Sequence, residues 1–220
     1  MQTITLPELA DLLASRPRGR RLLVAVAGAP ASGKSRLAEE LVERLEQSQA
    51  GRAAILPMDG YHYDDALLKQ LGRHARKGAP DTFDVGGLYH MLRRLRENAD
   101  DAIAVPVFDR DIETARAGAR LIPAAVDIVV VEGNYLLLRQ PPWSALRPFF
   151  DFTVMVLTPE TILRQRLAKR WAFYGLPPSE IDRKIEEVDL PNGRFVVQES
   201  AAAEYRIDND DVVQGSGPGI

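Results

Sequence analysis

The stretch "GAPASGKS", Gly28 to Ser35, decides the fold expected of this chain. It follows "LLVAVA" at 22–27, a short apolar run typical of a buried strand. It precedes a segment in which leucines recur at helical spacing. The pattern G-x-x-x-x-G-K-[ST] between a strand and a helix predicts a loop that binds the phosphates of a nucleotide.

The chemistry of this phosphate loop (Gly28–Ser35) follows from its residue types. Backbone N–H groups and the positive end of the following helix attract polyphosphate. Gly28 and Gly33 allow conformations and close approaches that a Cβ would obstruct. Lys34 is expected to reach the β- and γ-phosphates, and the Ser35 hydroxyl to bind Mg²⁺. The expected nucleotide-binding residues are Gly28, Ala29, Pro30, Ala31, Ser32, Gly33, Lys34, Ser35 and Arg36.

Composition narrows the class of protein. A length of 220 residues favours one domain, 1–220, with a sizeable core, and a net charge of −3 argues against nucleic-acid or anionic-membrane partners. The chain has no cysteine, so disulfides, zinc thiolates and thiol nucleophiles are excluded. Without a signal-peptide pattern or a run of apolar residues long enough to span a bilayer, a cytoplasmic location is expected. The tail at 212–220 is expected to be flexible.

Strand and helix signals alternate along the chain. This alternation predicts an α/β fold with a parallel sheet covered on both faces. The expected strands lie at 22–27, 52–59, 102–111, within 124–138, at 151–157 and at 204–208. Ligands of such sheets bind beyond the carboxyl ends of the strands, which is where the phosphate loop begins.

Three acids are predicted at the same sheet edge as the phosphate loop: Asp59, Asp109 and Glu132. Glu132 closes "DIVVVE", the position of an acid that holds Mg²⁺ directly or through water, although it could be a solvated strand end. Asp59 closes "ILPMD" and could accept a hydroxyl proton during phosphoryl transfer. It could instead orient water on Mg²⁺ or cap a helix.

Basic residues supply a second set of candidates. A helix is expected to start at Thr158 as its N-cap, and it carries Arg166 and Arg170 four residues apart on one face. This face could clamp the transferring phosphoryl group or be an exposed basic surface. Arg110 could face the substrate or form a surface pair with Asp109. No histidines have metal-ligand spacing.

The chain resembles the phosphoribulokinase/uridine kinase family of P-loop kinases. The resemblance extends to pantothenate kinases and is closest to bacterial proteins described as fructose-transport-system kinases. It spans roughly 22 to 195 and rests on motifs in a specific order. These are "GAPASGKS", "MDGYHYDD", "RKGAPDTFDV", "VPVFDRDIE", "VVVEGNYLLL", and "RQRLAKR" ahead of "DLPN".

The resemblance implies a three-layer P-loop fold with a mostly parallel sheet, flanking helices and a helical lid near 164–180. It implies Asp59 as the catalytic base, Glu132 as the metal-binding acid, and Arg166 and Arg170 as lid arginines. The acceptor-binding residues it suggests are His62, Tyr63, Arg76, Lys77, Asp84, Asp109 and Arg110. Asn192 falls near the nucleotide base. Phe108 stands where the family usually has tyrosine, which removes one hydroxyl from this region.

The expected activity is ATP- and Mg²⁺-dependent phosphorylation of a hydroxyl on a small acceptor, with a sugar or sugar acid preferred. Alternatives are a pantothenate- or nucleoside-type kinase, or an ATP-binding regulatory module without robust kinase activity. The expected partner is this small molecule, and the chain could be a monomer or a homodimer.

Overall fold

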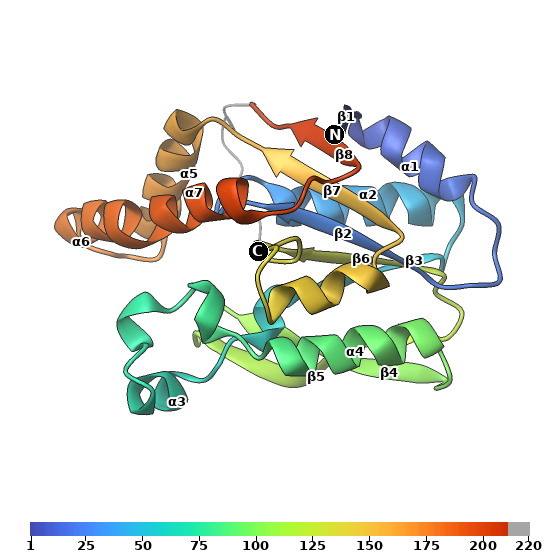
Figure 1. Ribbon diagram of the computed structural model, residues 1–220, viewed down its shortest axis with the longest axis horizontal. Coiled ribbons are helices and arrows are strands. Elements are labelled where there is room, and N and C mark those ends of the chain that lie inside the picture. Colours follow the sequence, from blue (N-terminus) through green and yellow to red (C-terminus); the bar gives the residue numbers. More distant parts are fainter. Residues whose placement is uncertain (211–220) are drawn as a thin grey trace.

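A six-stranded parallel sheet forms the centre of the molecule (Figure 1), a computed structural model in which residues 1–210 are described. The strands lie in the order β1-β8-β7-β2-β6-β3, and every neighbouring pair is parallel. Their bounds are β1 Gln2–Thr3, β2 Leu22–Gly28, β3 Ala53–Pro57, β6 Ile128–Gly133, β7 Phe152–Leu157 and β8 Tyr205–Asp208. The tail predicted to be flexible, 212–220, lies outside the described residues.

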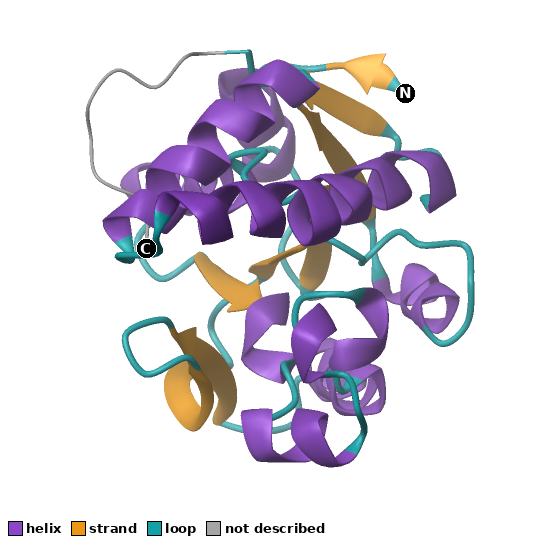
Figure 2. Cartoon of the chain, turned by 90° about the vertical axis from the view of Figure 1, so that its left-hand side faces the viewer, coloured by secondary structure: helices purple, strands orange, loops and turns teal. Residues whose placement is uncertain are grey.

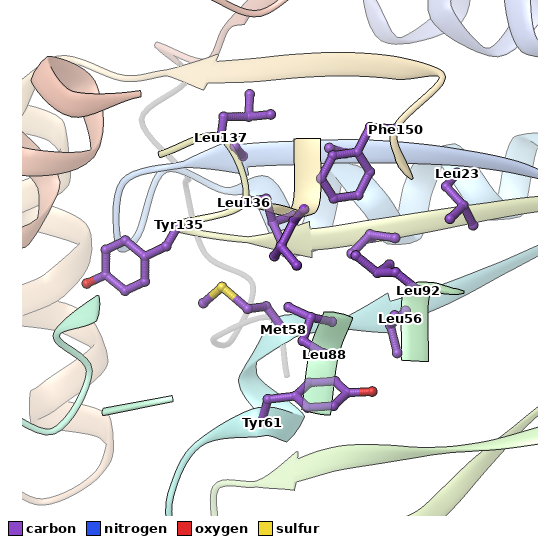
Figure 3. Packing of buried hydrophobic residues seen from close by; sticks show 14 of the residues in the cluster. Leu23, Leu56, Met58, Tyr61, Leu88, Leu92, Tyr135, Leu136, Leu137 and Phe150 are labelled. Carbon is purple, nitrogen blue, oxygen red and sulfur yellow. The ribbon is translucent and has the colours of Figure 1, made fainter. Parts of the chain in front are cut away.

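Helices cover both faces of this sheet. Along β2, Leu23 and Ala25 face a core shared with α4 (Val85–Glu97), whereas Val24 and Val26 face α1 (Leu6–Ala14) and α2 (Lys34–Ser48). Successive residues of a strand point to opposite faces, so an unbroken apolar strand serves two cores at once. Figure 3 shows the first of these cores, where leucines of α4 meet side chains from β2 and β3. The predicted three-layer α/β architecture is therefore confirmed.

A third helical group stands beyond the carboxyl ends of the strands. It comprises α5 (Glu160–Phe173), α6 (Pro178–Lys184), a π-helical turn (Ile185–Asp189) and α7 (Leu190–Glu199). These helices share a small apolar cluster of their own around Leu167 and Ile185. Figure 2 looks at this end of the molecule and shows the group above the β4–β5 hairpin. No helix within residues 1–210 is both long and apolar enough to cross a lipid bilayer.

One local expectation about this group is wrong. Thr158 is not the N-cap of α5, which begins at Glu160 after Pro159. The Thr158 hydroxyl instead donates to the carbonyls of Ser32 (3.1 Å) and Asn209 (3.2 Å), because the phosphate loop and the end of β8 lie beside it.

The strand predicted at 102–111 forms, but outside the parallel sheet. β4 (Ala102–Asp109) pairs with β5 (Thr114–Pro123) in an antiparallel hairpin, a second sheet of two strands. A short turn joins them where a parallel neighbour would need a crossover connection of a dozen or more residues. Asp109 therefore does not end a strand of the main sheet, and the prediction that it shares that edge is wrong.

Candidate active site

The phosphate loop joins β2 to α2 in the strand–loop–helix context expected from the sequence. Gly33, with φ +86°, precedes the first residue of α2, Lys34, and Ala31 also has a positive φ of 61°. At Gly28 the chain passes so close to β7 that a Cβ would lie 2.9 Å from the carbonyl oxygen of Val156. The N-terminus of this 15-residue helix leaves N–H groups free to bind an anion.

Three side chains from outside the loop hold its carbonyl groups. The Ser32 carbonyl accepts hydrogen bonds from Asn209 Nδ2 (2.7 Å), Thr158 Oγ1 (3.1 Å) and Arg166 Nη1 (3.2 Å). Arg166 also donates to the carbonyl of Ala31 at 3.2 Å. In a planar trans peptide the N–H points opposite to the carbonyl, so these bonds turn the N–H of Gly33 away from them. Arg166, expected on the phosphates, contacts the phosphate loop itself in this structure.

The buried acid at the end of β6 adjoins the loop. The side chain of Ser35 donates to Glu132 Oε2 at 3.0 Å, and Glu132 is only 6% exposed. Burial raises the pKa of Glu132, while nearby Lys34 opposes this change. Burial likewise lowers the pKa of Lys34, opposed by Glu132 and Asp59. A lysine and two carboxylates are thus gathered beside the first turn of α2.

Asp59 lies just beyond the end of β3, in the short 3₁₀ helix η1 (Met58–Tyr61). Pro57 is in register with Glu132, and Glu132 with Val26, so three adjacent strands end together. Gly133 makes the approach of η1 possible, since a Cβ there would collide with the side chain of Met58. Asp59 and Glu132 therefore lie at the same edge of the sheet, as expected of two acids that follow the carboxyl ends of parallel strands.

An arginine of the hairpin meets Asp59. Arg110 Nη2 donates to Asp59 Oδ2 at 2.6 Å, and both side chains are about a quarter exposed. Burial alone would raise the pKa of Asp59, but Arg110, together with His62, Lys34 and Arg170, outweighs it and lowers this pKa to about 2. Asp59 is therefore an ionised carboxylate surrounded by cations.

The hairpin is held against η1 by a backbone contact. A Cβ on Gly60 would lie 2.6 Å from the carbonyl oxygen of Pro106, so only glycine permits this approach. Behind Asp59, the ring of His62 lies between those of Phe83 (4.0 Å) and Phe108 (4.9 Å). Burial is the main cause that lowers the pKa of His62, so a neutral imidazole is expected at neutral pH.

The remaining candidates, on the acceptor side and beside the nucleotide, mainly contact neighbouring groups of the protein. Asp84 caps α4 by accepting from the N–H of Gly87 at 2.8 Å. Lys77 pairs with Asp65 at 2.7 Å, and its ammonium lies 5.2 Å from the centre of the Phe108 ring. The remaining contacts are Arg76 with Asp81 (2.7 Å), Asp109 with Arg116 (3.1 Å), Arg36 with Glu40 (3.0 Å), and the N–H of Tyr63 with the carbonyl of Thr82 (3.0 Å). Asn192 is half-buried on α7, beside Gly193, which adjoins the loop residue Ala29.

Arg170 on α5 is mostly buried and lies close enough to Asp59 and Arg110 for both to affect its pKa. Its pKa is lowered first by burial and next by Arg110, and Asp59 and Asp189 oppose this change. Asp189, at the end of the π-helical turn, is 8% exposed and accepts from the indole N–H of Trp171 at 2.7 Å. The lid arginine and the hairpin arginine therefore approach Asp59 from different elements.

Sequence reasoning missed the residues that support the site. Asn209 and Thr158 hold the phosphate loop, and Gly60 and Gly133 let η1 approach its neighbours. The only available signal was a glycine directly after two of the predicted site acids, Asp59 in "DG" and Glu132 in "EG". Nothing in the local sequence around Asn209 indicates its contact, because its partner lies 177 residues away.

Comparisons with known proteins agree on one family. The model described as "Phosphoribulokinase / Uridine kinase family" matches residues 23–186. A protein of Schizosaccharomyces pombe named "putative uridine kinase" is 32% identical, over 77% of this chain and 74% of its own. The Escherichia coli protein YggC is 35% identical, over 89% of this chain and 80% of its own.

A solved structure gives the same result for the fold. The crystal structure of a "putative fructose transport system kinase" from Silicibacter sp. TM1040 is 35% identical to this chain, with a TM-score of 0.84. The match covers 92% of this chain and 98% of the other. The architecture described above is therefore shared along nearly the whole length of that relative.

Proposed function

Because the chain belongs to the phosphoribulokinase/uridine kinase family, we propose that it transfers the γ-phosphoryl group of ATP to a hydroxyl of a sugar or sugar acid. The observation that carries this proposal is the position of Asp59. It is an ionised carboxylate beyond the end of β3, close enough to Lys34 for each to shift the pKa of the other. A carboxylate in this position can accept the proton of an acceptor hydroxyl during phosphoryl transfer.

Ser35 and Glu132 fit the metal ion that ATP requires. Both offer oxygen ligands, the hydroxyl and carboxylate already lie 3.0 Å apart, and Mg²⁺ commonly takes one or two protein oxygens together with phosphates and water. Within residues 1–210 no three acids or histidines cluster to hold a metal without a ligand's help. Bound Mg²⁺ would neutralise charge on the β- and γ-phosphates.

The protein's own groups would then act as follows. The free N–H groups of the phosphate loop and the Lys34 ammonium bind the polyphosphate and position its terminal phosphorus. Asp59 accepts the proton of the acceptor hydroxyl while the oxygen of that hydroxyl forms a bond with the γ-phosphorus. The bond between this phosphorus and the β–γ bridging oxygen breaks, which leaves ADP. Arg170 on α5 stabilises charge on the transferred group, and the helices α5–α7 form the lid that excludes water.

We expect Asp59→Asn to lower kcat by about 10²–10⁴-fold, the usual contribution of a general base. ATP affinity should change little, because the loop N–H groups and Lys34 provide most nucleotide contacts. The measurement is ADP release with the best acceptor from a panel of sugars, sugar acids, pantothenate and nucleosides, across a magnesium titration. Asp100→Asn is the matched control, since Asp100 also pairs with an arginine (Arg94, 2.8 Å) but away from the site.

Three outcomes would contradict parts of this proposal. Near-normal kcat in Asp59→Asn would exclude Asp59 as the base. Loss of nucleotide affinity that extra Mg²⁺ restores would assign Asp59 to the metal instead. Nucleotide turnover that no acceptor stimulates would favour an ATP-binding regulatory module, and stimulation by pantothenate or a nucleoside alone would favour those kinase types.

A further inference from the structure

The carboxylate assigned as the base is already occupied by Arg110. The 2.6 Å bond from Arg110 Nη2 to Asp59 Oδ2 stabilises the ionised carboxylate and holds its pKa at about 2. General-base catalysis is most efficient when the pKa of the base lies near the working pH. A base held this strongly by a guanidinium accepts a proton less readily, so transfer is favoured when Arg110 finds another partner.

Arg110 is delivered from the side away from the phosphate loop. Across the site the elements follow in the order β2, β6, β3 with η1, and then the β4–β5 hairpin, which contacts η1. Lys34 begins α2, which follows β2 through the phosphate loop, whereas Asp59 belongs to η1 and Arg110 to the turn of the hairpin. A nucleotide on the phosphate loop would therefore engage Lys34. The reacting hydroxyl must reach both Asp59 and the γ-phosphorus, so the rest of the acceptor can extend toward the hairpin and Arg110.

The hairpin side of Asp59 carries two cations beside an aromatic ring. Arg110 and Lys77 both lie near the ring of Phe108, at 5.5 and 5.2 Å from its centre. Lys77 has acidic partners in Asp65 and Glu113, but within residues 1–210 the only carboxylate in ion-pair contact with Arg110 is Asp59. Any negative group that enters from the acceptor side thus competes directly with Asp59 for this guanidinium.

We propose that the acceptor carries an anionic group, a carboxylate or a phosphate ester close to the reacting hydroxyl, and that Arg110 binds this group and so releases Asp59 to act as the base. This proposal rests on the kinase function proposed above. A guanidinium binds carboxylates and phosphates through two parallel N–H bonds, which a neutral hydroxyl cannot replace. The exchange also keeps the charge of Arg110 compensated while Asp59 takes the proton.

The test compares acceptors that share a carbon chain and differ in charge. The probes are glycerol, glycerate and glycerol phosphate, with ribose, ribonate and ribose 5-phosphate as a second set. The readouts are kcat/KM from ADP release and, independently of turnover, the rise in Tm when each probe is added to the protein with Mg²⁺ and ADP. Carboxylates and phosphate esters form separate arms, so the data also show which anion is preferred.

Arg110→Gln and Arg116→Gln are compared with the unchanged protein. Arg116 is the matched control because it is also a hairpin arginine paired with an aspartate, Asp109 at 3.1 Å. We expect anionic probes to be favoured over their neutral counterparts by about 10–100-fold, the range of one or two charge-assisted hydrogen bonds. Arg110→Gln should remove this preference and Arg116→Gln should keep it. In Arg110→Gln the base is freed with both members of a pair, so the lost preference reports anion binding together with release of Asp59. The Tm readout reports anion binding alone.

The failure of this proposal differs from failure of the kinase function. Turnover of neutral members as good as that of anionic ones, or an anion preference unchanged in Arg110→Gln, would overturn the role of Arg110 while leaving the kinase intact. Absence of turnover with every probe of the wider panel would overturn the kinase function. The Tm readout would still decide the question: a rise with anionic probes that Arg110→Gln abolishes supports the anion site, and no rise with any of them overturns it.

Discussion

The pairing of Asp59 with Arg110 shows how one side chain sets the properties of another. Burial disfavours an ionised carboxylate, yet the pKa of Asp59 lies well below its ordinary value of 3.8 because cations from three elements surround it. The contribution of such a group to stability depends on pH in a direction that can be worked out. It is fully present above the pKa of the unfolded chain and is lost as the pH falls toward the folded pKa of about 2.

A prediction follows for the stability of Arg110→Gln. Removing the guanidinium should raise the pKa of Asp59 and lower the free energy of unfolding by about 1 kcal/mol at pH 7. The difference from the unchanged protein should be constant at neutral pH. It should shrink as the pH falls through the raised pKa of Asp59 in the folded variant toward about 2, because Asp59 is then protonated in the folded variant before it is in the unchanged protein. Urea unfolding at a series of pH values measures this difference. An equal difference at pH 3 and pH 7 would show that the pair contributes nothing through ionisation.

At the scale of elements, the site is assembled by close backbone contacts. The short helix η1 lies between β6 and the β4–β5 hairpin, and a glycine at each contact leaves room for the neighbour. Gly133 admits Met58 on one side, and Gly60 admits the carbonyl of Pro106 on the other. Because Asp59 lies between these two contacts along the chain, its distance from Glu132 and from Arg110 depends on them.

Gly60→Ala tests this arrangement. The new Cβ would lie 2.6 Å from a backbone oxygen, which cannot rotate away as a side chain could, so the hairpin must shift. We expect a loss of about 1–3 kcal/mol in the free energy of unfolding, the usual cost of overpacking, together with a loss of kcat. Gly72→Ala is the control for general effects of alanine at a glycine, since nothing lies within 4 Å of its added Cβ and Gly72, with φ +67°, brings only backbone strain. Unchanged activity in a folded Gly60→Ala protein would show that hairpin position does not matter.

At the scale of the whole molecule, the helices α5–α7 lie on one side of the site, and α7 also packs against the sheet core through Val196. Their apolar cluster is distinct from the two cores of the sheet and reaches the phosphate loop through Ala29. Arg166 links α5 to the loop, while Phe173 at the far end of α5 is 67% exposed. The group is thus anchored at one end and open at the other, which is the arrangement expected of a lid. That the whole chain acts as one domain stays a prediction.

We expect bound ligands to protect this lid from trypsin. Cleavage in 164–184 should slow when a non-hydrolysable ATP analogue and an acceptor are both present, because closure would bring Arg170 to the phosphates and order α5 and α6. The internal control is cleavage in 16–20, a segment at the opposite end of the sheet that should be cut at the same rate throughout. Equal cleavage of 164–184 with and without both ligands would contradict a closing lid. Mass spectrometry of the fragments separates the two regions.

The sequence by itself determined the parallel sheet and the nature of its functional edge. Strand β2, the phosphate loop and α2 were predictable because their signal is local: a buried strand, two glycines at fixed spacing and a helical repeat. The expectation that Asp59 and Glu132 would meet held for the same reason, since parallel strands end at one edge. Which of the candidate residues act in catalysis remains a prediction for the experiments above.

The tertiary structure decided what the local sequence could not. Strand β5, rich in alanine, arginine and glycine, has little strand propensity. It was therefore not predicted, and its antiparallel pairing with β4 was missed as well. The contact of Arg110 with Asp59 spans 51 residues, and that of Asn209 with Ser32 spans 177. Hydrogen bonds of this kind depend on how distant elements pack, and no spacing along the chain encodes them. The sequence could thus place an acid, Asp59, beside a phosphate loop, but only the packed molecule shows that Arg110 already pairs with it.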